Sequence, residues 1–105
     1  MLTKPKKSLG QNFLIDKNIL QKIVNIIPIY KNKQILEIGP GTGNLTHYLV
    51  KKKPGKIFVI EKDNELSLFL SKKFKDKINI INEDVLKISE NLISKEKLIV
   101  FGNLP

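Results

Sequence analysis

Four short apolar runs, separated by stretches that fit helices, constrain this chain more than any other feature. They cover residues 35–38, 57–60, 78–81 and 98–101. Strands that alternate with helices of about ten residues imply right-handed crossovers and a parallel sheet. The usual winding of such a sheet gives the strand order 3-2-1-4, with the fourth run buried yet at one edge. We therefore expect an α/β, Rossmann-like fold.

Helices are expected before, between and after these runs. Asp16 is a good N-cap for an amphipathic helix that ends at Pro28. A second helix follows the glycines after the first run and closes at residues 51–55, and Asp63 can cap a third. A short, weakly patterned helix is plausible within residues 85–94.

The chain is strongly basic, with a formal net charge of +9 from 19 lysines and no arginine. Such an excess is typical of a protein that binds a polyanion, most often nucleic acid. The absence of alanine and arginine also suggests an AT-rich coding bias, which accounts for part of the basicity. Residues 1–10 are expected to form a flexible basic arm in which Lys4, Lys6 and Lys7 contact RNA, and residues 11–105 to form the ordered part.

Several classes of protein are disfavoured by what the sequence lacks. There is no cysteine and one histidine, so neither a disulfide nor a metal site is expected. We interpret His47 as a surface residue. No apolar stretch is long enough for a signal peptide or a membrane span. We expect a cytoplasmic monomer.

The residues that end the four runs are of the types found in nucleoside sites. Because the carboxyl ends of parallel strands share one edge of a sheet, these groups should meet in one crevice. Glycines let the backbone pass close to a ligand, and a carboxylate can bind both ribose hydroxyls. A second carboxylate could accept a hydrogen bond from an adenine amine, or could simply be a turn residue. The groups are Gly39, Gly41 and Gly43 after the first run, Glu61 after the second, Asp84 after the third and Asn103 after the fourth.

The first of these endings resembles a known motif. Glu37 and the three glycines complete the pattern E-x-G-x-G-x-G, which is similar to the first motif of S-adenosylmethionine-dependent methyltransferases. The resemblance implies that the loop lies along the methionine and ribose part of the cofactor. The N-terminus of the following helix would then favour the cofactor's carboxylate. The alternative is a helix-entry loop without a ligand.

The last ending, Asn103-Leu104-Pro105, resembles the motif with which amino-methyltransferases hold a target nucleobase amine. The Asn103 side-chain carbonyl and the Leu104 backbone carbonyl would accept both amine protons, which localises the lone pair on nitrogen. Pro105 would stiffen that arrangement. Methyl transfer by in-line displacement then needs positioning more than a strong base.

These motifs, together with the run over residues 7–14, resemble the ribosomal RNA adenine N6-dimethyltransferase family over nearly the whole chain. Residues 10–14 favour its small-subunit branch. The resemblance implies a class I methyltransferase fold. It further implies transfer of two methyl groups to each of two adjacent adenosines in a hairpin loop near the 3′ end of small-subunit rRNA, during ribosome biogenesis. The implied cofactor contacts are Asn12, Leu14, Gly39, Glu61, Asp84 and Asn103.

One departure from the family affects the expected activity. The family motif continues with an aromatic residue that stacks on the flipped base, whereas the sequence ends at Pro105, and the RNA-recognition lobe is expected to be missing too. The bare edge of the fourth strand would also be an aggregation hazard. We interpret residues 11–105 as the N-terminal part of the cofactor-binding domain, expected to bind cofactor weakly and to methylate RNA poorly alone. Alternatives are a large-subunit rRNA methyltransferase that confers antibiotic resistance, a non-catalytic rRNA-binding assembly factor, and a nicotinamide dehydrogenase.

Overall fold

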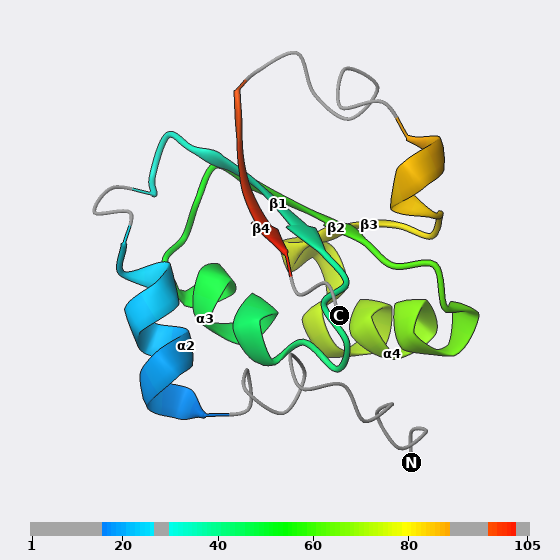
Figure 1. Cartoon of the computed structure of the whole chain (residues 1–105), viewed down its shortest axis with the longest axis horizontal. Helices are drawn as coiled ribbons and strands as arrows, with labels where there is room; N and C mark the ends of the chain where they lie inside the picture. Colours follow the sequence, from blue (N-terminus) through cyan, green and yellow to red (C-terminus); the bar gives the residue numbers. More distant parts are fainter. Residues whose placement is uncertain (1–15, 27–29, 89–96, 103–105) are drawn as a thin grey trace.

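The centre of the fold is a parallel sheet of four strands in the order β3-β2-β1-β4. It is seen in a computed structural model that describes residues 16–26, 30–88 and 97–102 (Figure 1). This order and the α/β fold class confirm the sequence prediction. The strands are β1 (Gln34–Ile38), β2 (Lys56–Ile60), β3 (Asn79–Ile81) and β4 (Leu98–Gly102).

Aspartates begin two of the three α-helices in the described residues, as predicted. The Asp16 carboxylate accepts hydrogen bonds from the backbone N–H groups of the first turn of its helix, and Asp63 does the same for a later helix. These bonds satisfy donors that have no partner within a helix. The helical segments are α2 (Lys17–Val24), α3 (Asn44–Lys51), α4 (Asn64–Phe74) and two short 3₁₀ turns, η1 (Lys75–Lys77) and η2 (Val85–Lys87).

Two helix boundaries differ from the prediction. Helix α2 ends at Val24 and not at Pro28, which lies outside the described residues. The apolar stripe stops being buried there, since Ile26 is 73% exposed. The helix expected in residues 85–94 is only a three-residue 3₁₀ turn within the described part, because the backbone becomes extended at Ile88, with φ −113° and ψ 131°.

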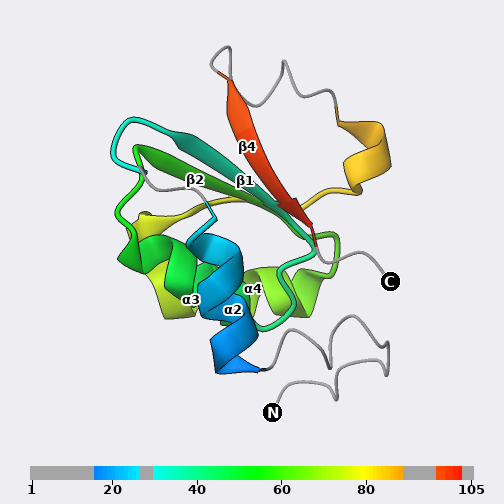
Figure 2. The same cartoon turned by 60° about the vertical axis from the view of Figure 1, so that its left-hand side comes forward.

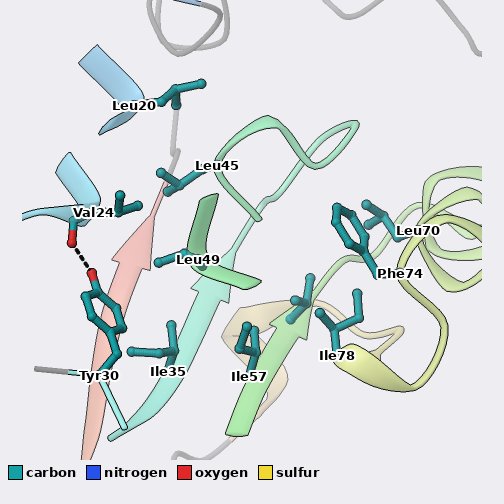
Figure 3. Close-up of a cluster of buried hydrophobic side chains, with 11 residues drawn as sticks. Leu20, Val24, Tyr30, Ile35, Leu45, Leu49, Ile57, Leu70, Phe74 and Ile78 are labelled. Carbon is teal, nitrogen blue, oxygen red and sulfur yellow. Dashed lines mark hydrogen bonds between the residues drawn. The ribbon is translucent and has the colours of Figure 1, made fainter. Parts of the chain in front are cut away.

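The three α-helices lie on one face of the sheet (Figures 1 and 2). The connections β1-α3-β2 and β2-α4-β3 step in the same direction, so right-handed crossovers place α3 and α4 on the same side. Alternate strand residues such as Ile35, Ile57 and Val59 point into the core between the sheet and these helices (Figure 3). The other core residues are Leu20, Val24, Tyr30, Leu45, Leu49, Leu70, Phe74 and Ile78.

Strand β4 is less buried than its apolar sequence predicts. Ile99 and Phe101 pack against the core, but Val100 on the opposite face is 50% exposed. The prediction of a buried strand is therefore wrong for one face. The reason is the topology, because an edge strand has a neighbour on one side only. Within the described residues no helix combines the length and apolar character needed to cross a membrane.

Candidate functional site

The loop between β1 and α3 depends on its glycines. Gly39, Gly41 and Gly43 have φ angles of 66°, 60° and 90°, a region that other residues enter only with strain. A Cβ on Gly43 would lie 2.6 Å from Cε2 of Phe74, whereas a Cβ on Gly41 would meet no atom within 4 Å. The loop is thus pressed against α4 at Gly43 and faces open space at Gly41. A ligand can approach the backbone at that point.

The acid that begins this glycine motif is buried beneath the loop. Glu37, near the end of β1, is 1% exposed, and its carboxylate accepts a hydrogen bond from the Thr46 hydroxyl of α3. Burial raises the pKa of Glu37 to about 7, although the bond from Thr46 opposes the rise. Because Glu37 has almost no exposed surface, we assign it to holding the loop and α3 together.

Glu61 connects the end of β2 to the glycine loop. Its Oε2 accepts the backbone N–H of Asp63 at 3.0 Å. Burial raises the pKa of Glu61, whereas backbone hydrogen bonds from Asp63, Gly41 and Lys62 lower it, against the raising effect of the Asp63 charge. The N–H of Gly39 donates to the carbonyl of Ile60 at 3.1 Å, which joins the start of the glycine loop to the residue before Glu61. The acid and the loop are therefore neighbours, as the strand-end argument predicted.

The main chain at Glu61 is fixed from three sides. Its N–H donates to the carbonyl of Ile81 at 3.0 Å, which continues the pairing of β2 with β3. Its carbonyl accepts the Ser67 hydroxyl at 3.1 Å and the Asn82 side-chain amide at 2.9 Å. These contacts leave the backbone little freedom, so the carboxylate is presented in one position.

Asp84 lies beyond the end of β3, at the same edge of the sheet as Glu61. Its Oδ1 accepts the backbone N–H of Leu86, and its carbonyl accepts the N–H of Lys87 at 2.9 Å. The turn role weighed from the sequence is therefore present. Asp84 is half-buried and its second carboxylate oxygen has no hydrogen bond among the described residues, so a ligand contact remains compatible with that turn.

Helix α3 starts at this edge without a side-chain cap. Its N-cap is Gly43, which makes no side-chain hydrogen bond to the first turn. The N–H groups of that turn are available to an anion, and the helix dipole favours negative charge there. The open space at Gly41, the helix N-terminus and the Glu61 carboxylate together fit the methionine carboxylate and the ribose of S-adenosylmethionine.

A lysine of α4 reaches the glycine loop from outside. Lys73 Nζ donates to the carbonyl of Thr42 at 3.1 Å and lies over the rings of Phe69 and Phe74 at 5.6 and 5.3 Å from their centroids. The sequence alone did not indicate this contact, because it joins residues 31 positions apart.

The sequence predicted Glu37 only as part of a motif. It gave no role to four further residues near the site, which are Thr46, Ser67, Lys73 and Asn82. Asn82 directly follows β3, so the expectation that residues after parallel strands meet at one edge of the sheet could have identified it. Thr46 and Ser67 stand on helix faces and carry no such signal. Lys73 belongs to a charged segment that resembles any solvated helix end.

The interpretation of His47 as a surface residue is confirmed, and the two tyrosines are packing residues. His47 is exposed, and partial burial together with Lys51 and Lys73 lowers its pKa. Tyr30 is a packing residue whose hydroxyl donates to the carbonyl of Val24 in the core (Figure 3). Tyr48 is half-buried against the core.

Several predicted site residues lie outside the described part of the chain. They are the proposed cofactor contacts Asn12 and Leu14, the RNA contacts Lys4, Lys6 and Lys7, and the motif Asn103, Leu104 and Pro105. The described strand that leads to this motif ends beside the glycine loop, because Gly102 pairs with Ile38, the residue before Gly39.

The family model of ribosomal RNA adenine dimethylases matches residues 2–105 of this chain. The chain belongs to this ribosomal RNA adenine dimethylase family. A protein of Pelagibacter ubique named ribosomal RNA small subunit methyltransferase A is 61% identical over the whole chain, which covers 40% of that protein. A protein of the same name from Mycoplasma mobile is 50% identical over 95% of the chain and 38% of its own length.

Two solved structures of methyltransferases share the fold. A dimethyladenosine transferase from Plasmodium falciparum has a TM-score of 0.72 and 26% identity, with 86% of this chain and 32% of that chain covered. The 23S rRNA methyltransferase ErmE also has a TM-score of 0.72, with 25% identity over 83% of this chain and 35% of its own. The chain thus spans about 40% of the length of the curated dimethylase relatives that it matches.

Proposed function

We propose that the protein transfers methyl groups from S-adenosylmethionine to adenosine N6 atoms of small-subunit ribosomal RNA. Its family and the names of relatives that are 38% to 61% identical support the substrate. The observation that carries the proposal is the position of Glu61. Its buried carboxylate follows β2, whose last residue, Ile60, accepts the N–H of Gly39 at 3.1 Å, so the acid lies beside the glycine loop and its open space at Gly41.

Each part of the site has one binding role in this proposal. Glu61 accepts hydrogen bonds from the ribose hydroxyls, the N-terminus of α3 attracts the methionine carboxylate, and Asp84 accepts the adenine amine. Asn12 and Leu14 are further proposed contacts. When bound, S-adenosylmethionine supplies an electrophilic methyl group.

The transfer step is assigned to the residues that follow β4. The Asn103 side chain and the Leu104 carbonyl accept the two protons of the adenine N6 amine, and Pro105 fixes that carbonyl. The nitrogen lone pair is then directed at the methyl group, and positioning lowers the barrier. The pairing of Gly102 with Ile38 supports this role, because it brings the end of β4 next to the glycine loop.

At finer detail, we propose dimethylation of two adjacent adenosines in a hairpin loop near the 3′ end of the rRNA, during ribosome biogenesis in the cytoplasm. Residues 11–105 form the N-terminal part of the cofactor-binding domain. Residues 1–10 are a basic arm in which Lys4, Lys6 and Lys7 contact the RNA. The protein acts as a monomer without a metal.

Calorimetric titration of the chain with S-adenosylmethionine, and with NADH in parallel, tests the cofactor assignment. We expect saturable binding of the methyl donor alone, weakened at least tenfold in Glu61→Gln and several-fold in Asp84→Ala, since ionic hydrogen bonds contribute about 1.5–3 kcal/mol. Glu65→Gln is the matched control, because Glu65 is an exposed acid of α4. Binding of NADH would exclude the methyltransferase assignment.

The RNA target is tested with a hybrid that joins residues 1–105 to the part of the Pelagibacter ubique relative outside the match. The hybrid is incubated with tritiated S-adenosylmethionine and unmethylated small or large ribosomal subunits. Label in small-subunit rRNA supports the proposal. Label in large-subunit rRNA alone would favour the second candidate, to which the match with ErmE points.

A further inference from the structure

The edge of the sheet opposite the cofactor site is lined by lysines. Each strand begins at or just after one: Lys33 precedes β1, Lys56 starts β2, Lys77 comes two residues before β3, and Lys97 precedes β4. Because all four strands are parallel and paired in register, their starts share the edge of the sheet opposite their ends. The four lysines, named here the amino-edge row, therefore share one side of the molecule.

The strand pairing places the row at nearly one level. Gln34 pairs with both Lys56 and Leu98, so Lys33 and Lys97 precede paired positions. Phe58 pairs with Asn79, which puts Lys56 and Lys77 level with each other. Strands lie about 4.8 Å apart, so the row extends for about 14 Å. That length fits several successive phosphates of a nucleic acid strand.

The surface along the row is hollowed and positive. One hollow of about 400 Å³ is lined by Lys31, Lys33, Lys56 and Lys97 with three uncharged residues, and it contains no acid. A second hollow beside it is lined by Lys53, Lys56 and Lys77, with Asp76 as its one acid. The backbone under the row is tied down, because Gly55 N–H donates to the Lys33 carbonyl at 2.8 Å.

A simple structural role does not account for these lysines. Cations often gather at helix C-termini, where the dipole is negative, and this explains Lys51 and Lys52 at the end of α3. Lys33, Lys56 and Lys97 stand outside every described helix. Their position requires another explanation.

Acids gather at the other edge of the sheet. Six of the eight acids in the described residues stand at or near the carboxyl ends of the strands, and the four that are at least partly exposed, Asp63, Glu65, Glu83 and Asp84, repel phosphates. A polyanionic substrate that presents a base there is held better when cations elsewhere attract its backbone. The six are Glu37, Glu61, Asp63, Glu65, Glu83 and Asp84.

We infer that the amino-edge row is a second RNA-binding surface, which contacts the phosphate backbone about 17 Å from the cofactor edge, the length of a five-residue strand. The inference rests on the proposed function only in taking RNA as the polyanion. It assigns no base recognition to the row, since lysine contacts to phosphate carry no sequence information.

The test compares three quadruple variants of the whole chain in binding a fluorescent RNA hairpin, followed by anisotropy from 0.05 to about 0.3 M salt. The first changes Lys33, Lys56, Lys77 and Lys97 to glutamine. The second changes the same four to arginine. The control changes Lys17, Lys22, Lys72 and Lys87 to glutamine and so removes the same charge from exposed positions elsewhere.

We expect the row-to-glutamine variant to lose at least about tenfold in affinity at 0.1 M salt, and its salt slope to fall by about three units. The arginine variant should bind like the wild type and the control should lose less than about threefold. Equal losses in the control and row variants, or no RNA binding by the folded wild type, would overturn the inference. Thermal unfolding and S-adenosylmethionine titration of every variant separate this result from misfolding and from failure of the proposed function.

Discussion

Glu37 makes the stability of the fold depend on pH. Its pKa is raised from 4.5 to about 7 by burial, so the native state binds a proton more tightly than the unfolded state between these values. This contribution to stability is complete below pH 4.5 and is lost as the pH rises through 7. The loss amounts to about 3 kcal/mol, at 1.36 kcal/mol per pKa unit.

We therefore predict that Glu37→Gln removes this part of the pH dependence. The amide keeps an acceptor for Thr46 and cannot ionise. Urea unfolding at pH 5 and pH 8 should show a smaller loss of stability in the variant than in the wild type, by about 3 kcal/mol. The control is Glu65→Gln, whose pH dependence should match the wild type. An unchanged pH dependence in Glu37→Gln would mean that the buried acid is not protonated in this range.

Alanine substitutions at Gly41 and Gly43 should affect stability and ligand binding differently. We predict that Gly43→Ala costs about 2–4 kcal/mol, from the positive φ and from a methyl group forced against Phe74 and Leu70. Gly41→Ala should cost only the backbone strain, about 1–2 kcal/mol, because its Cβ meets no neighbour.

The loss of S-adenosylmethionine affinity should be larger in Gly41→Ala than in Gly43→Ala, which is the opposite of their order in stability. The methyl group of Gly41→Ala projects into the space assigned to the cofactor, so S-adenosylmethionine affinity should fall more than tenfold in the folded variant. Chemical denaturation and calorimetry check the pair. If Gly41→Ala bound the cofactor as the wild type does, the ligand could not lie over that part of the loop.

At the scale of elements, α4 supports the glycine loop through one hydrogen bond, from Lys73 to the Thr42 carbonyl. We predict that Lys73→Met lowers S-adenosylmethionine affinity about three- to tenfold, because a single hydrogen bond contributes about 0.5–1.5 kcal/mol. The unfolding free energy should fall by no more than about 1.5 kcal/mol, the contribution of the lost hydrogen bond. Calorimetry measures the first quantity and urea unfolding the second.

Lys72→Met is the matched control for the loop contact, since Lys72 is the exposed neighbour in α4. Lys73→Arg should restore most of the affinity by donating to the same carbonyl. Equal effects of the two methionine variants would show that charge near the site, and not the contact with Thr42, sets the affinity.

The elements were predictable where local chemistry determines them. The cap at Asp63, the stop at residues 51–55 and the apolar runs each act over a few residues, and the strand order follows from crossover handedness. The end of α2 was not predictable, because Ile26 continues the apolar sequence yet finds nothing to pack on. Burial depends on what tertiary structure places nearby.

The candidate site likewise has one part that the sequence predicted and one part that only the tertiary structure shows. The rule that parallel strands end at one edge brought Glu61 and the glycine loop together from the sequence, and the hydrogen bond from Gly39 to the Ile60 carbonyl agrees with it. The contacts that hold this arrangement, from Ser67, Asn82 and Lys73, join elements whose relative position is set by packing. No periodicity in the sequence reports such contacts.

For the whole molecule, the decisive feature is that the two faces of the sheet differ at the β4 edge. The described α-helices cover one face (Figure 2), while on the other face Val100 is half exposed although Leu36 beside it is buried. Substitutions at two neighbouring residues of β4 can therefore compare how much burial on each face contributes to stability. Ile99 packs against the core beside the helices, and Val100 pairs with Leu36 on the opposite face.

We predict that Ile99→Ser costs about 2 kcal/mol or more in unfolding free energy and that Val100→Ser costs less than about 1 kcal/mol, because less apolar area is lost from the interior. Urea unfolding at low protein concentration gives both values, and sedimentation gives the oligomeric state. Val100→Ser should also reduce aggregation, since an apolar edge strand invites pairing with another chain. Equal costs at the two positions would mean that the second face is covered in solution, and a concentration-dependent cost at Val100 would identify a second copy as the cover.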